Sequence, residues 1–242
     1  MNRFQKMPMN RMQRPGINQS PGTPIGKGAG ITERERGVFS AAESKFKEMG
    51  LMATPGYIRV ERKLITGQSK YVFKVTRDSN ADSFTEQKLE RNDQFMASQI
   101  CLFLMKRVDS TLGAEILCTY PDVTIFTTTG NPAGLESVYN GKLSVTIGQT
   151  KWIEALDTRR FRKVPTRQAQ PAIASIQSVF IPETNDNDGF FKLTPQITID
   201  GDQKNEIAVE IPANASIVTS GAGSGTENYL VLVIRGFLGT IK

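Results

Sequence analysis

Apolar and polar side chains alternate along residues 142–147 of the chain. A period of two is typical of a β-strand that buries one of its faces. The Asn140-Gly141 pair before this strand favours a type I′ hairpin turn, because both residue types tolerate positive φ angles. A second turn, at residues 148–150, reverses the chain into a further strand. The stretch from 134 to 168 is therefore predicted to contain three strands joined by two tight turns.

Similar segments recur along the rest of the chain, separated by Gly, Pro, Asn and Asp. The helices that a parallel sheet would need between its strands are missing. We therefore predict an all-β fold, an antiparallel β-sandwich over residues 57–242. Residues 95–105 are the most continuously apolar and are expected to be buried on both faces. The predicted strands are residues 57–65, 70–77, 95–105, 114–119, 123–128, 142–147, 151–156, 172–181, 190–199, 206–211 and 228–241.

Two local structures are expected early in this β-region. Residues 57–65 and 70–77 should pair as a hairpin across a turn that contains Gly67. Residues 79–92 are polar, and Ser83 and Glu86 have the spacing of a capping box, which favours one short helix there.

One amphipathic helix is predicted before the β-region, in residues 31–50. Thr32 with Glu35, or Ser40 with Glu43, has capping-box spacing, and Gly50 is typical of the residue that follows a helix. Its apolar face is expected to pack either on the domain's own sheet or on a neighbouring subunit. The residues on that face are Val38, Phe39, Ala42, Phe46 and Met49.

Residues 1–30 differ in composition from the rest and are predicted to form a flexible, extended arm. They are rich in Met, Asn, Gln, Pro and Gly, and their four prolines oppose regular structure. The arm has five basic residues and no acid, so it carries five of the six net positive charges and leaves +1 for the remaining 212 residues. Its glycine-rich end, residues 26–30, lacks the Lys-Ser/Thr ending of a phosphate loop and is expected to be a hinge.

The sequence contains no histidine. This excludes nucleophiles that depend on a histidine base and metal sites with histidine ligands. No cofactor fingerprint and no placeable pair of carboxylates is found, so we predict no catalytic, cofactor or metal site and expect that the protein is not an enzyme. Residues 184–189 and 221–225 are expected to be loops rather than calcium or nucleotide sites.

The two cysteines, Cys101 and Cys118, lie in apolar segments and are expected to be buried free thiols. Trp152, the single tryptophan, also lies in an apolar segment. No apolar run is long enough for a transmembrane helix, and the N-terminus lacks the apolar core of a secretory signal.

Positive charge is concentrated after the strand at 151–156, around a single aromatic residue, Phe161. Such a segment could bind phosphate while the ring stacks on a base, or it could form ion pairs across a subunit contact, where Arg is enriched. We favour the contact, since one aromatic residue is too few for a single-strand track. Together with the arm, the predicted subunit or nucleic-acid contact residues are Arg3, Lys6, Arg11, Arg14, Arg159, Arg160, Arg162, Lys163 and Arg167.

A basic arm (1–30), a short amphipathic helix (31–50) and about 185 residues of antiparallel β-structure (57–242) resemble the jelly-roll capsid and virion structural proteins of icosahedral viruses and bacteriophages. The resemblance covers the whole chain as architecture, without a diagnostic motif. It implies a self-assembling capsid subunit located in the virion, a homo-oligomer that also contacts other virion proteins. It also implies an arm that reaches neighbouring subunits or makes nonspecific contact with the genome.

Two alternatives remain open from the sequence. The first is a nucleic-acid-binding β-domain, with the arm and the basic segment as contacts. The second is a virion accessory or spike protein with a carbohydrate-binding type of sandwich, which would need exposed aromatic residues.

Overall fold

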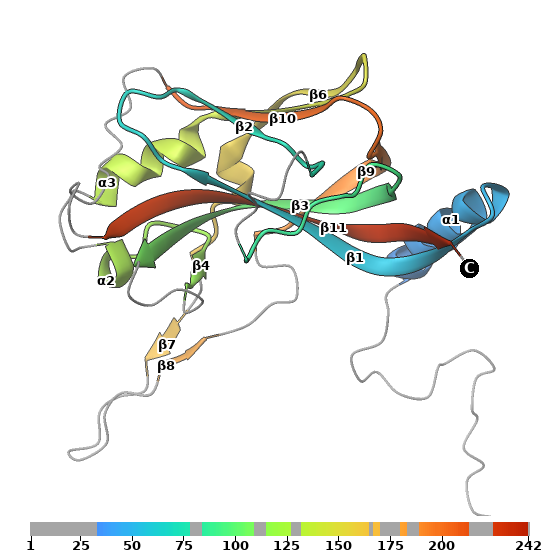
Figure 1. Ribbon diagram of the computed structural model, residues 1–242. Coiled ribbons are helices and arrows are strands. Elements are labelled where there is room, and N and C mark those ends of the chain that lie inside the picture. Colours follow the sequence, from blue (N-terminus) through green and yellow to red (C-terminus); the bar gives the residue numbers. More distant parts are fainter. Residues whose placement is uncertain are drawn as a thin grey trace, which may run out of the picture.

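A computed structural model of the chain shows two antiparallel β-sheets packed face to face, with a long helix at one end of the larger sheet (Figure 1). The predicted antiparallel β-sandwich is therefore confirmed. The structure describes residues 33–77, 84–108, 115–126, 132–164, 167–169, 180–182, 189–212 and 225–241. The predicted arm, most of the predicted strand 172–181 and most of the loops 184–189 and 221–225 lie outside these residues.

The larger sheet, sheet A, is built on three long strands in the order β1-β11-β3. Two further strands, β9 and β4, pair with different parts of the other edge of β3. The five strands of sheet A are β1 (Leu51–Lys63), β3 (Gln94–Val108), β4 (Leu117–Cys118), β9 (Phe191–Asp200) and β11 (Thr226–Ile241).

The smaller sheet, sheet B, has the strand order β2-β10-β5-β6. A separate pair of short strands, β7 and β8, belongs to neither large sheet. These strands are β2 (Lys70–Phe73), β5 (Lys142–Ile147), β6 (Thr150–Asp157), β7 (Arg167–Ala169), β8 (Phe180–Pro182) and β10 (Asn205–Glu210).

The strands of the two sheets pair in a nested way. When β4, β7 and β8 are set aside, the first strand pairs with the last (β1 with β11) and the second with the seventh (β2 with β10). The third pairs with the sixth (β3 with β9), and the fourth with the fifth (β5 with β6). The β3–β11 and β5–β10 pairings then join these four pairs into two sheets. Every connection except that between β5 and β6 therefore crosses from one sheet to the other.

The main core lies between the inner faces of the two sheets. In β5, Leu143, Val145 and Ile147 are buried and the residues between them are not, as the alternating pattern predicted. They belong to one cluster with inner-face residues of sheet A such as Ile58 and Leu232. This shared cluster holds the sheets together.

Strand β3 is buried on both faces over most of its length, which confirms the prediction for residues 95–105 except at the half-buried Ser98 and Gln99. Ile100, Leu102 and Leu104 belong to the core between the sheets. Cys101, Phe103 and Met105 point to the opposite, outer face and form a second cluster with β11 side chains. The six consecutive residues are all buried, so no alternation was visible in the sequence.

The predicted helix is present as α1, Glu33–Glu48, and it packs on the outer face of sheet A (Figure 1). Its buried residues are Ala42 and Phe46, which contact Met96 of β3 and its neighbours. Phe39 and Met49, which were predicted to share the buried face, are about 40% exposed. Gly50 follows the helix with a φ of 72°, as expected of a helix-terminating glycine.

The prediction of a strand and a type I′ turn at residues 134–141 is wrong. The chain forms the short helix α3 (Pro132–Leu135) and the 3-10 helix η2 (Glu136–Asn140), while Gly141 is extended. Val138 and Tyr139 are both buried, which successive residues of a half-buried strand would not be. A side chain at Gly141 would lie 2.2 Å from the Glu210 carbonyl oxygen, so this glycine permits a close backbone approach rather than a turn.

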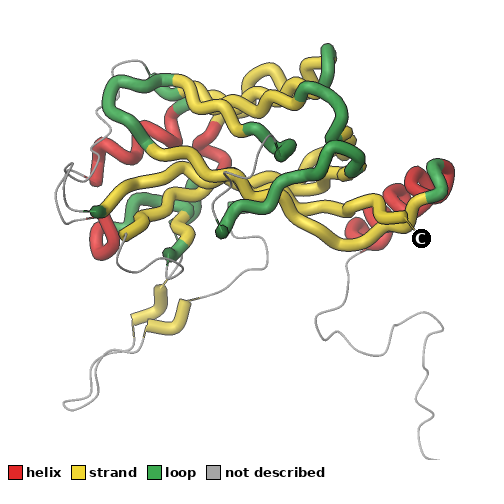
Figure 2. Tube along the Cα trace, in the orientation of Figure 1, coloured by secondary structure: helices red, strands yellow, loops and turns green. Residues whose placement is uncertain are grey.

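Other local predictions also fail. In the range 123–128, the β-branched sequence forms a helical turn, α2 (Val123–Phe126), in which the Asp122 carbonyl accepts hydrogen bonds from the next turn. Figure 2 shows these helical turns, in red, at the end of the sandwich opposite α1. The predicted strand 114–119 is reduced to the two residues of β4. Tertiary packing overrides local strand propensity at these sites.

The predicted hairpin of residues 57–65 and 70–77 does not form, because β1 and β2 belong to different sheets. The turn containing Gly67 carries the chain between the sheets instead. Within residues 84–92 the structure has no helix, contrary to the prediction for 79–92, and the chain makes isolated bridges to Arg59 and Thr76.

Candidate functional site

The predicted basic segment begins in a 3-10 helix, η3 (Thr158–Phe161), directly after β6. The Asp157 carboxylate caps this turn by accepting a hydrogen bond from the Arg159 backbone N–H at 2.9 Å. Thr158 is buried; its hydroxyl donates to the Val138 carbonyl at 2.9 Å and accepts from the Gly141 N–H at 2.8 Å. The segment is therefore anchored on η2.

Arg162 of this segment is engaged within the subunit. Its Nε and Nη2 atoms both donate to the Glu136 carboxylate at 2.7 Å, a bidentate ion pair. These hydrogen bonds raise the pKa of the Arg162 guanidinium above its ordinary value. Lys163 is tied to the fold through its backbone, since its N–H donates to the Thr119 carbonyl at 3.2 Å.

Arg159 and Arg160 are exposed on the anchored turn. The Arg160 guanidinium lies 5.4 Å from the centre of the Phe191 ring, and Arg159 donates to the Asn140 side chain at 3.2 Å. Both contacts orient the side chains and leave them available at the surface. Of the predicted contact residues in this segment, Arg159 and Arg160 therefore lie side by side at the surface, whereas Arg162 is bound to Glu136 within the subunit.

Phe161 is fully buried, so its ring is unavailable for stacking on a base. This removes the aromatic contact from the nucleic-acid interpretation of the segment. Arg167 lies in β7, where only its backbone pairing is described. The other predicted contact residues, Arg3, Lys6, Arg11 and Arg14, lie outside the described residues, and their place relative to this segment stays a prediction.

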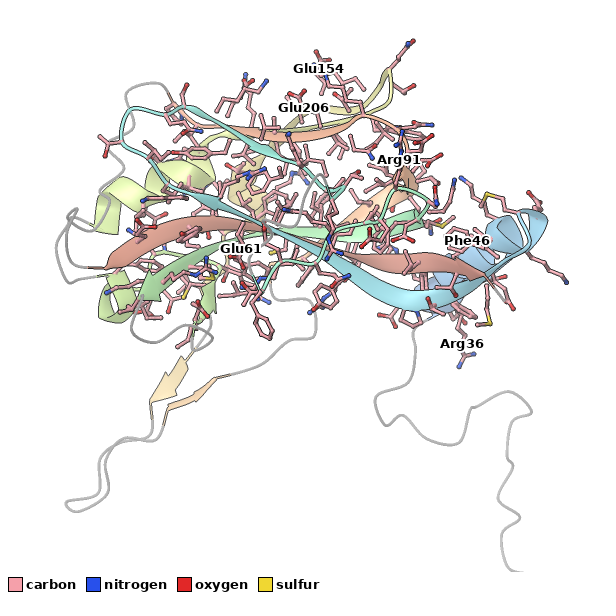
Figure 3. The ribbon with its side chains drawn as sticks, viewed as in Figure 1. Arg36, Phe46, Glu61, Arg91, Glu154 and Glu206 are labelled. Carbon is pink, nitrogen blue, oxygen red and sulfur yellow. The ribbon has the colours of Figure 1, made fainter. Side chains whose placement is uncertain are left out.

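A cluster of buried charges that the sequence did not reveal surrounds Glu61 of β1, on the outer face of sheet A (Figure 3). The Glu61 side chain is only 2% exposed. Arg59 Nε donates to Glu61 Oε1 at 2.9 Å, and Arg107 of β3 donates to Glu61 Oε2. Arg107 Nε also donates to Glu115 at 3.0 Å, and its guanidinium lies 4.6 Å from the centre of the Tyr229 ring.

The electrostatics of the cluster favour its charged state. Burial lowers the pKa of Arg107, but its hydrogen bonds to Glu115 and Glu61 outweigh burial and hold the pKa above its ordinary value. In the sequence, Arg59 and Glu61 alternate with apolar residues and look like a solvated strand face. The one available signal was the opposite charge of these two residues at neighbouring same-face positions.

Residues 84–90, which we name the strap, cross the edge of β1 beside this cluster. Arg59 and Gln87 exchange two backbone hydrogen bonds of 2.8 and 2.9 Å. The Glu61 N–H donates to Glu86 Oε1 at 2.9 Å, and the Thr85 hydroxyl donates to Glu61 Oε1 at 2.7 Å. The strap thereby satisfies part of a sheet edge that would otherwise expose unpaired backbone groups.

A polar cleft of about 540 Å³ lies at the end of sheet B, beside the turn at residues 201–202. Arg91, labelled in Figure 3, forms an ion pair with Asp202 at 2.9 Å. Arg77 forms a second ion pair, with Glu90. Asn205, which is 9% exposed, also lines the cleft, and its buried side-chain oxygen has no hydrogen-bond partner among the described residues. The lining of the cleft holds four basic residues, Lys74, Arg77, Arg91 and Lys204, and two acidic ones, Asp202 and Glu206, and ion pairs already engage Arg77 and Arg91.

Both cysteines are free and buried, as predicted. Burial raises the pKa of the Cys101 thiol, and burial together with the nearby Asp122 raises the pKa of Cys118 to about 11. A thiol with so high a pKa is a poor nucleophile at neutral pH. Trp152, expected in an apolar strand, is 45% exposed on β6, the edge strand of sheet B. Among the described residues, no three acids or cysteines gather as metal ligands would.

No protein-family model, curated protein or solved structure matches this chain. In the part of the chain that the structure describes, no helix combines the length and the apolar character needed to cross a membrane.

Proposed function

We propose that the protein is a structural subunit of a virion and that its sandwich is a jelly roll. The observation that carries this proposal is the nested pairing of the eight strands, from first with last to fourth with fifth. A long antiparallel hairpin rolled into two sheets has this pairing, and jelly rolls recur in viral capsids, lectins and cupins.

The surface and the chemistry of the chain favour a capsid role among these classes. The sequence has no histidine, and burial keeps its two thiols protonated. The chain therefore offers few of the nucleophiles and general bases that an enzyme on this fold would use. Arg159 and Arg160 stand exposed on a turn that is anchored by buried hydrogen bonds. Arginine is enriched in protein interfaces, and obligate interfaces bury on the order of 2,000 Å² or more.

The test is the assembly state of the full chain, measured by size-exclusion chromatography with light scattering and by negative-stain imaging. We expect large, closed particles or stable oligomers at micromolar concentration. Reversing both charges, Arg159→Glu with Arg160→Glu, should give smaller species. The matched control reverses two exposed lysines of sheet B and its flanking turn, Lys142→Glu with Lys204→Glu, and should assemble normally. A chain that stays monomeric at high concentration in every preparation would overturn the proposal.

A further inference from the structure

We propose that the strap is an autoinhibitory contact: it occupies the outer edge of β1 and thereby prevents two copies of the chain from pairing there edge to edge. An unpaired edge strand offers a row of N–H and C=O groups to a strand of another chain. The inference concerns a contact between copies that the folded chain blocks. It therefore goes beyond the proposed function and does not require that the chain assembles through other surfaces.

Among the described residues, β1 is the longest strand at a sheet edge. Its 13 residues pair with β11 without interruption, so the opposite side of β1 is a continuous edge. The other edge strands are short or irregular. β2 and β4 have four and two residues, and register shifts interrupt the pairing of β6 and of β9. Because long, regular edges pair most readily with other chains, β1 is the edge that most needs protection.

Every second residue of β1 directs its backbone N–H and C=O away from β11, since these groups alternate in direction along an antiparallel strand. Arg59 is one of these outward residues, because it exchanges backbone hydrogen bonds of 2.8 and 2.9 Å with Gln87 of the strap. Pro55 and Glu61, which lie an even number of positions away, therefore face outward as well. The Glu61 N–H donates to the Glu86 side chain of the strap at 2.9 Å, and Pro55 has no N–H to offer.

Tyr57 is the outward residue between the proline and the strap. In the described part of the structure its backbone N–H makes no hydrogen bond outside the sheet, and its side chain is 55% exposed. A second strand could pair with this position but not continue past Pro55 on one side or past Arg59 on the other. Since strands in proteins usually have at least about three residues, the proline and the strap together leave too short a stretch for stable pairing.

The strap is held by both sheets. On the side of sheet A, the Thr85 hydroxyl donates to the buried Glu61 carboxylate at 2.7 Å. On the side of sheet B, the Leu89 N–H donates to the Val75 carbonyl and the Arg77 N–H donates to the Leu89 carbonyl, each at 2.9 Å. The Leu89 side chain is buried in the main core. Opening the strap therefore breaks buried contacts, so the edge stays covered in the native state.

The first test weakens the strap at its backbone contact. Gln87→Pro removes the N–H that donates to the Arg59 carbonyl, and the matched control Gln87→Ala removes only the side chain and keeps the backbone donor. By light scattering at equal concentration, we expect Gln87→Pro to form dimers or larger species that the parent and Gln87→Ala do not form. A folded Gln87→Pro protein with the association state of the parent would overturn the inference. If Gln87→Pro does not fold, Thr85→Val with Glu86→Ala loosens the strap without a proline and is measured in the same way.

A second substitution separates edge pairing from a general loss of stability. Tyr57→Pro removes the outward N–H of this position without removing a hydrogen bond to β11, and the residue before it is a glycine, Gly56. Added to Gln87→Pro, it should restore the association state of the parent. A protein that associates because it is merely destabilised would associate more, not less, with a second proline. Association that survives Tyr57→Pro would therefore refute pairing at this edge.

Hydrogen exchange at single residues identifies the edge directly. The Tyr57 N–H should exchange fast in the parent and at least about tenfold more slowly in associated Gln87→Pro, because pairing with a second copy protects it. If the parent assembles and its Tyr57 N–H is already protected, native contacts use the β1 edge; this inference then fails and the proposed function stands. If the parent never assembles, the proposed function fails, and the strap variants still test this inference.

Discussion

At the scale of single residues, the carboxylate of Glu61 is a buried charge that needs partners to be stable. Removing a charge from water is costly, and the cost is offset only when partners satisfy it. Arg59, Arg107 and Thr85 all contact the Glu61 carboxylate, and Arg107 is shared with Glu115. The cluster links β1, β3 and the strap, so its loss should destabilise the packing of all three.

We predict that Glu61→Ala lowers the free energy of unfolding by about 3–5 kcal/mol, because it leaves two buried or half-buried arginines without their shared partner. The control is Glu154→Ala on β6, whose ion pair with Lys151 is exposed and should be worth at most about 1 kcal/mol. Urea unfolding of both variants measures the difference. Equal effects of the two substitutions would mean that the Glu61 cluster does not bear on stability.

The cysteines give a prediction about pH. Burial holds the pKa of Cys118 at about 11, so at pH 8 only about one thiol in a thousand is ionised. Iodoacetamide should therefore modify the native protein far more slowly than the protein in guanidinium. The raised pKa also implies that stability falls as the pH rises from about 8.5, where the unfolded thiol ionises, towards 11. Native alkylation as fast as in denaturant would contradict the burial of both thiols.

At the scale of elements, β3 is the strand on which the fold is centred. It pairs with β11, β9 and β4, and both of its faces are covered. We predict that Leu102→Ala, on the inner face, costs about 2–5 kcal/mol and that Phe103→Ala, on the outer face, costs about 3–5 kcal/mol. An ordinary amphipathic strand would show only one such loss for two adjacent residues. Denaturant unfolding decides, and a well-folded, unchanged Phe103→Ala protein would refute burial of the outer face.

Two glycines test the geometry of α1 and β11. Gly37 lies inside α1 with open space around it, so Gly37→Ala should stabilise the protein by about 0.5–1 kcal/mol. In Gly236, a Cβ atom would lie 2.0 Å from the Met96 carbonyl oxygen, next to the irregularity in the β3–β11 register. Gly236→Ala should therefore destabilise the protein by about 1–3 kcal/mol or more. Thermal melts of both variants provide the measurement: the melting temperature should rise for Gly37→Ala and fall for Gly236→Ala.

At the scale of the whole molecule, the chain combines a nearly neutral sandwich with an arm that carries most of the net charge. If the five basic residues of the arm each neutralised a phosphate, the log–log salt slope of nucleic-acid binding would be at most about −3.5 to −4.5. One arm is then too weak for tight binding at physiological salt, although many arms on one shell could act together. The alternative is that the arm clamps neighbouring subunits through Met7, Met9, Met12 and Ile17.

We predict that deleting residues 1–30 impairs assembly, whereas replacing Arg3, Lys6, Arg11 and Arg14 by Gln does not, because the apolar residues and prolines suit an extended docked strand. Light scattering follows assembly, and the ratio of absorbance at 260 and 280 nm follows retained nucleic acid. Loss of nucleic acid in both variants would favour genome contact over the clamp. Unchanged assembly and unchanged nucleic acid in both would exclude either role.

Some features could be predicted because the signal is local. The alternation in residues 142–147 and the 3.6-residue period of the helix are each set by neighbouring positions that share a face. The continuous apolar run of β3 likewise signals burial without any knowledge of its partners. The basic segment was visible as a run of charge, but the sequence did not distinguish the exposed Arg159 and Arg160 from Arg162, which Glu136 binds from another element.

The amino-acid sequence by itself determined the class of the fold, the place of helix α1, the burial of β3 and the concentration of charge in the arm. Only the tertiary structure decided the rest. Hydrophobic periodicity tells which face of a strand is buried but not which strand it pairs with, so the expected hairpin of β1 and β2 became a crossing between sheets. Long-range pairing also joined Glu61 to Arg107 across 46 positions, and packing turned residues 134–140 into helix because Val138 and Tyr139 both had to be buried.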